Sequence, residues 1–154
     1  MLKKDPSFTF LKGKKQKKSK PVFGILGDLD ELLAVLGLTK AFAISKNFKK
    51  QITFLQDDLV AIGGFLSGVK KIDLPEKINF LEEKIKVTDK FSIKAFSRPG
   101  INKTSAWLHL ARTVCRRLER KLVSFKTSQK LLLVSYFNRL SFLLFLLACQ
   151  QEKK

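Results

Sequence analysis

Apolar residues recur at helical spacing through five segments of the chain, and this pattern constrains the fold more than any other feature. In the first segment Leu29, Leu32 and Leu36 repeat every three or four residues, which places them on one helix face. No stretch alternates long enough to predict a strand, and no internal repeat is present. We expect an all-α bundle of four to five helices, at about 26–46, 48–66, 75–87, from shortly after Gly100 to 125, and 128–151.

The spacing of two acidic residues predicts where the first helix begins. Asp28 followed by Glu31 is typical of a capping box, in which Asp28 accepts backbone N–H groups and Glu31 reaches back to the cap. The preceding residues, 1–21, are basic and weakly periodic. We treat them as a separate N-terminal segment, and residues 22–154 as a single helical-bundle domain.

The last helical segment is apolar enough to be mistaken for a membrane span. Asn138 and Arg139 interrupt the apolar run at its centre, so we interpret it as a buried helix and expect no membrane span. Residues 1–20 lack the apolar stretch of a secretory signal. Cys115 and Cys149 show neither disulfide-framework nor zinc spacing, which suits a reducing cytosol, and we expect a cytoplasmic protein.

Basic residues outnumber acidic ones by 31 to 13, which gives a formal charge of +18 and favours polyanionic partners. The chain is also rich in Lys and has 14 Phe against one Tyr and one Trp, which indicates a drift in composition. Under such drift arginine persists where its planar, bidentate fork is required. The positions of the arginines are therefore more informative than the total charge.

Four arginines and one glutamate fall within residues 112–120. On a helix, Arg112, Arg116 and Arg120 share one face with Glu119 beside them. Such a stripe can clamp an oligophosphate while the carboxylate fixes the guanidinium directions. A solvated basic face has the same pattern, so both interpretations stay open from the residues alone.

Three further features carry weaker signals. Asn138 and Arg139 stand within an apolar helix and need polar partners, either in a site or as a structural pair that ties two helices. Asp30 is a free acid next to the expected cap, and its spacing falls short of a calcium loop. Periodicity places Phe142 and Phe145 in the core. We expect no metal site built from side chains.

Four segments in register resemble the PduO-type ATP:corrinoid adenosyltransferases, also called cob(I)alamin adenosyltransferases. Residues 27–32 (GDLDEL) are similar to the family's G-T-x-D-E-L, and residues 96–100 (FSRPG) to its F-x-x-P-G-G turn. Residues 108–120 (LHLARTVCRRLER) resemble L-H-x-A-R-x-x-x-R-R-A-E-R, and residues 136–141 (YFNRLS) resemble Y-L-N-R-L-S. The resemblance runs in order from about Gly13 to Cys149.

The resemblance implies a five-helix bundle that forms a homotrimer with active sites between neighbouring subunits. It also implies the reaction, in which Co(I) of cobalamin or another corrinoid attacks the 5′ carbon of Mg-ATP and releases triphosphate. Cobalamin or another corrinoid, ATP and Mg²⁺ are therefore the expected ligands, with Mg²⁺ held through ATP. A flavoprotein reductase is an expected partner.

The matching positions divide between the two substrates. The resemblance implies that Arg112, Glu119, Arg120 and Asn138 bind ATP and that Lys18 neutralises its phosphates. On the corrinoid side, it implies a second set of residues with catalytic roles. This set comprises Asp30, Phe96 and Arg116. Arg116 would pair with Asp30 of the next subunit. Phe96 would press on the lower face of the corrin and displace its lower ligand, which gives a four-coordinate Co(II) that is easier to reduce.

The N-terminal segment departs from the family pattern. Where the family has a glycine-rich T-G-D-x-G-x-T segment around the triphosphate, residues 3–8 read KKDPSF, and Pro6 removes an N–H donor. The aspartate that ends the family's N-R-L-S-D is Phe142 here, and the second glycine of P-G-G is Ile101.

Two alternatives follow from these departures and from the charge. A homologue that has lost the chemistry would bind corrinoid or serve in assembly. A basic helical protein that binds nucleic acid is the more remote alternative, because no helix-turn-helix, zinc finger or aromatic stacking platform accompanies the lysine-rich residues 12–20.

Overall fold

The structure, a computed structural model, describes residues 5–89 and 98–153. These residues form a short hairpin followed by five helices. The elements are β1 (Phe8–Leu11), β2 (Lys14–Lys17), α1 (Pro21–Phe42), α2 (Lys46–Leu66), α3 (Leu74–Thr88), α4 (Lys103–Ser124) and α5 (Lys130–Glu152).

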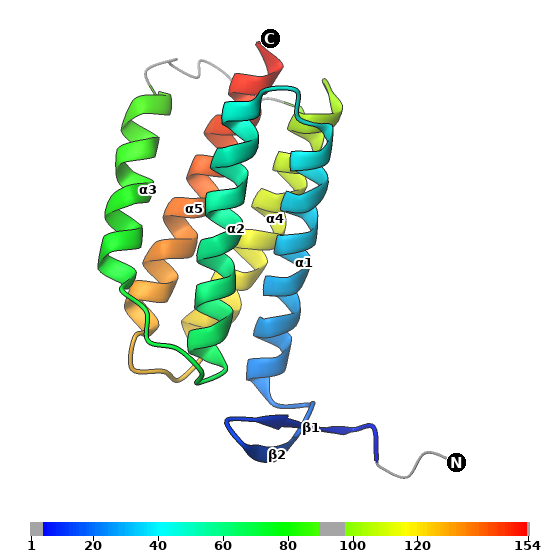
Figure 1. Cartoon of the computed structure of the whole chain (residues 1–154), viewed down its shortest axis with the longest axis vertical. Coiled ribbons are helices and arrows are strands. Elements are labelled where there is room, and N and C mark those ends of the chain that lie inside the picture. The colour runs from blue at the N-terminus through cyan, green and yellow to red at the C-terminus, as the bar shows by residue number, and fades with distance from the viewer. Residues whose placement is uncertain (1–4, 90–97, 154) are drawn as a thin grey trace.

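The five helices run alternately up and down in one bundle (Figure 1). Helix α1 packs against α2 and α4, α4 packs against α5, and α5 packs against α3. The rings of Phe54 in α2 and Phe80 in α3 lie 4.1 Å apart between centroids, which brings the remaining two helices together. The sequence-based prediction of an all-α bundle is therefore confirmed for the helical part of the chain.

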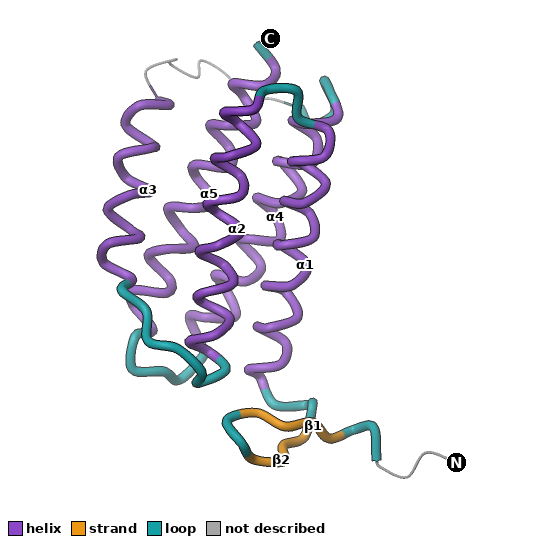
Figure 2. Tube along the Cα trace, viewed as in Figure 1, coloured by secondary structure: helices purple, strands orange, loops and turns teal. Residues whose placement is uncertain are grey.

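The hairpin contradicts the expectation that the chain has no strands. Strands β1 and β2 pair antiparallel from Phe8 opposite Lys17 to Leu11 opposite Lys14, and they extend from one end of the bundle (Figure 2). Lys12 and Gly13 both have positive φ, 53° and 70°, as a tight two-residue hairpin turn requires. Each strand has only four residues: the apolar alternation of β1 (FTFL) covers just three of them, and β2 (KKQK) shows none.

The first helix begins a full two turns earlier than the capping-box pattern predicts, and that prediction is wrong. Helix α1 starts at Pro21, a residue suited to a first helical position because its missing N–H has no partner there. Asp28 consequently lies inside the helix, where it is buried. A true capping box occurs instead at the start of α4, between Asn102 and Ser105.

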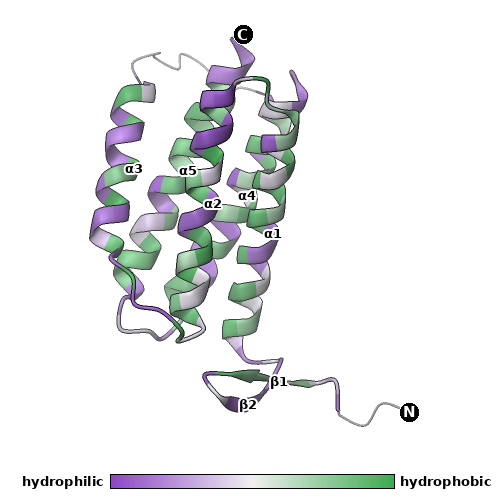
Figure 3. Cartoon of the chain, in the orientation of Figure 1, coloured by the Kyte–Doolittle hydropathy of each residue, from purple (hydrophilic) through white to green (hydrophobic). Residues whose placement is uncertain are grey.

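Helix α5 is the central apolar helix of the bundle, as expected. It is the one described helix long and apolar enough to cross a membrane, but 56% of its most apolar window is buried inside the protein. Hydrophobic residues dominate α1 and α5, whereas α3 and one end of α2 carry more hydrophilic ones (Figure 3). The contacts of α5 with α4 and α3 account for its apolar character as core packing.

A buried polar cluster ties three helices together. Asp58 of α2 is 2% exposed and accepts a hydrogen bond over 3.2 Å from the hydroxyl of Tyr136 in α5. Its other carboxylate oxygen pairs with the ammonium of Lys77 in α3. Burial, followed by the charge of Asp58, raises the pKa of Tyr136 well above its ordinary value. The carboxylate and the phenol satisfy each other inside the core.

Candidate functional site

Helices α4 and α5 form the walls of a cavity of about 560 Å³. Arg112 and Arg116 stand one turn apart on α4, and Asn138 faces the same space from α5. These three residues were predicted from sequence as site residues, and the fold brings them together. The described residues that line it are Arg112, Arg116, Asn138, Arg139, Ser141, Phe142 and Phe145.

Asn138 and Glu119 connect the two walls. The Nδ2 of Asn138 donates a hydrogen bond to Oε1 of Glu119 over 3.0 Å. One turn later on α5, the hydroxyl of Ser141 donates to the backbone carbonyl of Asn138 over 2.8 Å. The hydrogen bond to Glu119 fixes the direction of the Asn138 amide beside the cavity.

The arginines on this face of α4 lack neutralising partners. Arg116 and Arg120 are exposed and make no ion pair with any carboxylate among residues 5–89 and 98–153. Arg112 is half-buried, and its Nε is buried without a hydrogen-bond partner in that part of the chain. These three guanidinium groups span two turns of helix, about 12 Å. Uncompensated forks at this spacing suit a polyanion such as an oligophosphate.

Arg117 and Arg139 have a different role, since both are engaged within the bundle. Arg117 pairs with Glu31 and lies 3.3 Å through Nε from Asp28, so it joins α4 to α1. Arg139 pairs with Glu82 of α3 over 2.8 Å. The structural interpretation of the Asn138–Arg139 pair therefore describes Arg139 well, although this arginine also lines the cavity.

Asp28 was expected to cap a helix and instead forms a buried ion cluster. Its two carboxylate oxygens lie 3.3 Å from Nε of Arg117 and 2.8 Å from Nζ of Lys121. Glu31, the expected partner of the cap, pairs with Arg117. The acidic start of the family-like segment thus holds α1 against α4 below the candidate site.

Asp30 lies on α1 and is exposed, without an ion-pair partner in the described residues. Within one chain it forms no ion pair with Arg116, so the predicted pairing of these two residues is not an intrachain ion pair. Lys18 lies in the turn between β2 and α1, where it is exposed and does not line the cavity. Phe96 lies outside the described residues.

The sequence-based interpretation missed the apolar side of the cavity. Phe142 is 41% exposed and Phe145 is half-buried, and both line the cavity rather than filling the core as periodicity had predicted. They follow Asn138 at four and seven residues, so helical spacing from that residue could have identified them. The cavity therefore combines cationic and aromatic surfaces.

The cysteine on α4 is buried and unreactive. Cys115 is fully buried on the inner face of α4, its thiol donates to the carbonyl of Phe137 over 3.3 Å, and burial raises its pKa well above the ordinary value. Neither described cysteine forms a disulfide. Among the described residues no three His, Cys, Asp or Glu side chains are grouped to hold a metal ion.

Near the N-terminus, residues 5–7 form a local turn in place of a glycine-rich loop. The backbone N–H and the hydroxyl of Ser7 both donate to Oδ1 of Asp5, over 2.9 and 2.6 Å. These hydrogen bonds lower the pKa of Asp5, with the side-chain bond contributing most. The Asp5 carboxylate is thus engaged by its own turn.

Comparisons with known proteins point to one family. The family model for cobalamin adenosyltransferase matches residues 3–151. The corrinoid adenosyltransferase PduO of Salmonella typhimurium is 30% identical over 91% of this chain, and the chain spans only 45% of that protein's length. The corrinoid adenosyltransferase of Bacillus subtilis is 32% identical over 75% of this chain and is covered over 66% of its own length.

Solved structures agree with the sequence comparison. A variant PduO-type ATP:corrinoid adenosyltransferase from Lactobacillus reuteri in complex with cobalamin and ATP superposes with a TM-score of 0.85. It is 26% identical, and the match covers 96% of this chain and 87% of that one. A second variant of the Lactobacillus reuteri protein, complexed with ATP, gives the same TM-score at 27% identity.

Proposed function

The chain belongs to the cobalamin adenosyltransferase family, and on this premise we propose that it transfers the 5′-deoxyadenosyl group of ATP to the Co(I) centre of cobalamin or another corrinoid. The observation that carries the proposal is the α4–α5 cavity, where uncompensated arginines and the Asn138–Glu119 pair adjoin an aromatic wall. This combination offers one surface for phosphates and another for an apolar ring system.

The reaction is a nucleophilic displacement at carbon. The Co(I) electron pair forms the new cobalt–carbon bond while the bond between C5′ and its oxygen breaks, and the released electron pair leaves on triphosphate. Cobalt is formally oxidised from Co(I) to Co(III), so a reductase must supply the Co(I) state. The protein's task is to hold C5′ in line with cobalt and to stabilise charge that develops on the leaving phosphates.

The residues proposed for ATP are Arg112, Arg120, Glu119 and Asn138, with Lys18 contributing positive charge from the hairpin end. Arg112 and Arg120 have guanidinium groups without described carboxylate partners, which leaves them available for phosphate oxygens. Glu119 orients the Asn138 amide, whose oxygen remains an acceptor for the nucleotide. Mg²⁺ would be held through the ATP phosphates, because the described side chains provide no ligand cluster of their own.

For the corrinoid we propose Arg116 together with Asp30 of the partner subunit in a homotrimer. Each of these residues is exposed and lacks an ion-pair partner within the described part of one chain, as expected for groups that meet across an interface. Phe142 and Phe145 supply an apolar wall beside Arg116. Phe96 would complete the site by excluding the lower cobalt ligand.

We further propose a cytoplasmic protein that receives Co(I) corrinoid from a flavoprotein reductase. Two buried cysteines without a disulfide are compatible with a reducing compartment. The reaction consumes Co(I), so an electron donor must regenerate that state, and a flavoprotein reductase is the class of partner that we propose.

One observation favours a second candidate function, a homologue that binds corrinoid without catalysis. The Asp5–Ser7 turn and Pro6 occupy the place of the family's glycine-rich phosphate segment, so the chain has fewer backbone donors for triphosphate there. This alternative retains the α4–α5 cavity and loses productive ATP binding.

An anaerobic optical assay separates the two candidates. Purified protein is mixed with chemically reduced cob(I)alamin and Mg-ATP, and the visible spectrum is followed as the cobalt–carbon bond forms. We expect adenosylcobalamin from the unaltered chain, a rate at least a hundredfold lower for Arg120→Ala, and an unchanged rate for Lys46→Gln. A corrinoid spectrum that shifts on binding without product would instead support the non-catalytic homologue.

A further inference from the structure

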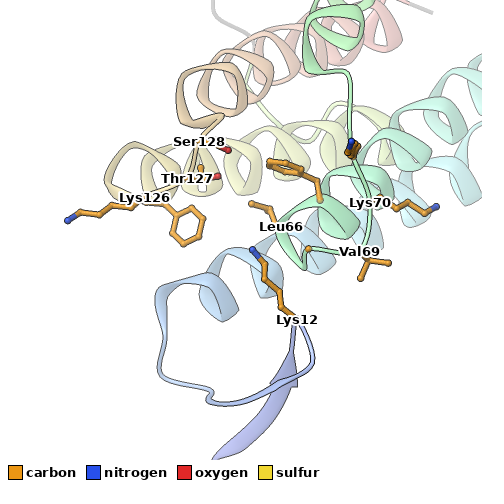
Figure 4. Close-up of a pocket in the computed structure, with 11 residues that line it drawn as sticks. Lys12, Leu66, Val69, Lys70, Lys126, Thr127 and Ser128 are labelled. Atoms are coloured by element: carbon orange, nitrogen blue, oxygen red, sulfur yellow. The ribbon is translucent and has the colours of Figure 1, made fainter.

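A second cavity, of about 480 Å³, lies at the end of the bundle from which the hairpin extends. Three separate segments enclose it, namely the hairpin turn at Lys12, the residues after α2 and the connection between α4 and α5 (Figure 4). It shares no residue with the α4–α5 cavity. Its lining comprises Lys12, Phe65, Leu66, Gly68, Val69, Lys70, Lys71, Phe125, Lys126, Thr127 and Ser128.

Four lysines and no carboxylate line this second cavity. Other lysines of the protein do form ion pairs: Lys77 pairs with Asp58, and Lys121 pairs with Asp28. None of the four lining lysines makes an ion pair with a carboxylate in the described ranges. Mutual repulsion of these cations is relieved when an anion enters.

Lys12 is an exposed residue of the hairpin turn and makes no ion pair with a described carboxylate. Its own φ is 53°, in the left-handed region, and its side chain lies directly over Gly68, whose φ is 75°. A Cβ on Gly68 would come within 2.7 Å of Cγ and Cε of Lys12, so only glycine permits this approach. Figure 4 shows the Lys12 amine pointing toward the connection that holds Thr127 and Ser128.

The other polar groups extend the site beyond one phosphate. The hydroxyls of Thr127 and Ser128 make no hydrogen bond with any described residue and can both donate to an anion. The side chains of Lys126 and Lys70 are exposed and point outward on opposite sides of the cavity, whereas that of Lys12 points inward between the segments (Figure 4). Lys12 is thus the central cation, with further positive charge at both sides for the ends of a phosphate chain.

We propose that this lysine-lined cavity binds an oligophosphate anion, with Lys12 as its central contact. The volume falls within the range of small-ligand sites, roughly 300–1,000 Å³. The shared ligand chemistry is a chain of phosphates, whose source is either free oligophosphate or the tail of a nucleoside triphosphate. The site does not depend on the adenosyl transfer proposed above, because its lining is separate from that of the α4–α5 cavity.

Isothermal titration calorimetry of the full chain with inorganic triphosphate, and separately with ATP, tests the proposal. We expect Lys12→Gln to weaken triphosphate binding about tenfold, as loss of one charge-assisted contact implies. The charge-matched controls Lys46→Gln and Lys86→Gln change exposed lysines far from the cavity and should alter affinity less than twofold. Free oligophosphate is the source if triphosphate binds at least as tightly as ATP; the nucleotide is the source if ATP binds tighter and Lys12→Gln weakens both.

A charge-neutral variant makes the test sharper. Gly68→Ala keeps the net charge but displaces Lys12, so we expect it to weaken triphosphate binding about as much as Lys12→Gln. Gly100→Ala, which also replaces a glycine of positive φ (114°) but has open space at its added Cβ, controls for backbone strain and should not weaken triphosphate binding. Thermal unfolding of each variant shows whether a loss of triphosphate binding comes from misfolding. If Gly68→Ala misfolds, the result for Lys12→Gln decides whether the proposal holds.

Three outcomes would overturn the proposal. Equal losses in the Lys12, Lys46 and Lys86 variants would mean a diffuse charge effect. Loss of triphosphate binding in Arg120→Ala but not in Lys12→Gln would place the phosphates in the α4–α5 cavity. A single-stranded oligonucleotide that binds more tightly than triphosphate and loses affinity in Lys12→Gln would identify the surface as part of a nucleic-acid site.

Discussion

The amide nitrogen Nδ2 of Asn138 lies 3.0 Å from Oε1 of Glu119, and this hydrogen bond joins α5 to α4 at the wall of the cavity. Glu119 of α4 thereby accepts from an amide of α5, and it lies on α4 beside Arg116 and Arg120, which have no carboxylate partner among the described residues. The arrangement leaves the arginines available for an external anion and holds the amide in a fixed orientation. It is the contact on which the assignment of the ATP side most depends.

The Asn138–Glu119 contact predicts coupling between the two residues. Asn138→Ala and Glu119→Gln should each raise the KM for ATP, and their effects should be non-additive by about fivefold, as one hydrogen bond implies. Steady-state kinetics of the four proteins of a double-mutant cycle measures this. Simple additivity would mean that the contact does not orient the amide for ATP.

Arg116 and Asp30 should behave as an intersubunit pair. Each alanine substitution should lower the rate at least tenfold, and the charge-swapped double variant Asp30→Arg/Arg116→Asp should recover part of the loss. The assay is the anaerobic corrinoid reaction, with analytical ultracentrifugation to record the oligomeric state. A double variant no better than either single variant, in an intact trimer, would contradict the pairing.

Asp28 should contribute to stability, since it is buried between two cations. Asp28→Leu leaves Lys121 without its carboxylate and should lower the free energy of unfolding by about 2 kcal/mol, less than for a fully buried pair because both cations are partly exposed. Asp57→Leu, at an exposed acid with no described ion pair, should change it by less than about 0.5 kcal/mol. Urea unfolding measures both. Equal effects would refute the role of the cluster.

The raised pKa of Tyr136 predicts loss of stability at high pH. Because the pKa of Tyr136 is raised above the ordinary value of 10.0, the folded state holds this proton more tightly than the unfolded chain does. The resulting contribution to the free energy of unfolding is complete below pH 10.0 and declines as the pH rises further. Tyr136 is the chain's one tyrosine, so its tyrosinate absorbance reports it alone. We expect ionisation to coincide with alkaline unfolding, and Tyr136→Phe to weaken the pH dependence, the remainder coming from the lysines that also titrate in this range. Ionisation near pH 10.0 in the folded protein would contradict the buried contact.

The helices could be predicted from sequence because each buries an apolar stripe whose spacing is visible locally. The start of α1 could not, since the Asp28–Glu31 pattern of a cap also fits a helix interior. In the helix interior these acids are engaged by Arg117, which lies 86 positions from its partner Glu31. The hairpin was missed because a lysine-rich strand of four residues gives no alternation.

Some residues of the candidate site could likewise be predicted from the sequence, and others could not. Arg112, Arg116 and Asn138 converge because helical spacing puts the two arginines on one face of α4, and α5 packs against that face. Asp30 does not join them within one chain, and its role depends on a second subunit that periodicity cannot reveal. The lysine-lined cavity was equally invisible, because it is assembled from three connections distant in sequence.

The most direct measurement of the central claim is the stoichiometry of a single turnover. Cob(I)alamin, Mg-ATP and excess protein are quenched together, with the corrinoid product identified by mass spectrometry and the phosphates by phosphorus NMR. The account predicts one adenosylcobalamin and one intact triphosphate for each ATP consumed. Unchanged ATP beside bound corrinoid, or diphosphate and phosphate without a cobalt–carbon product, would contradict it.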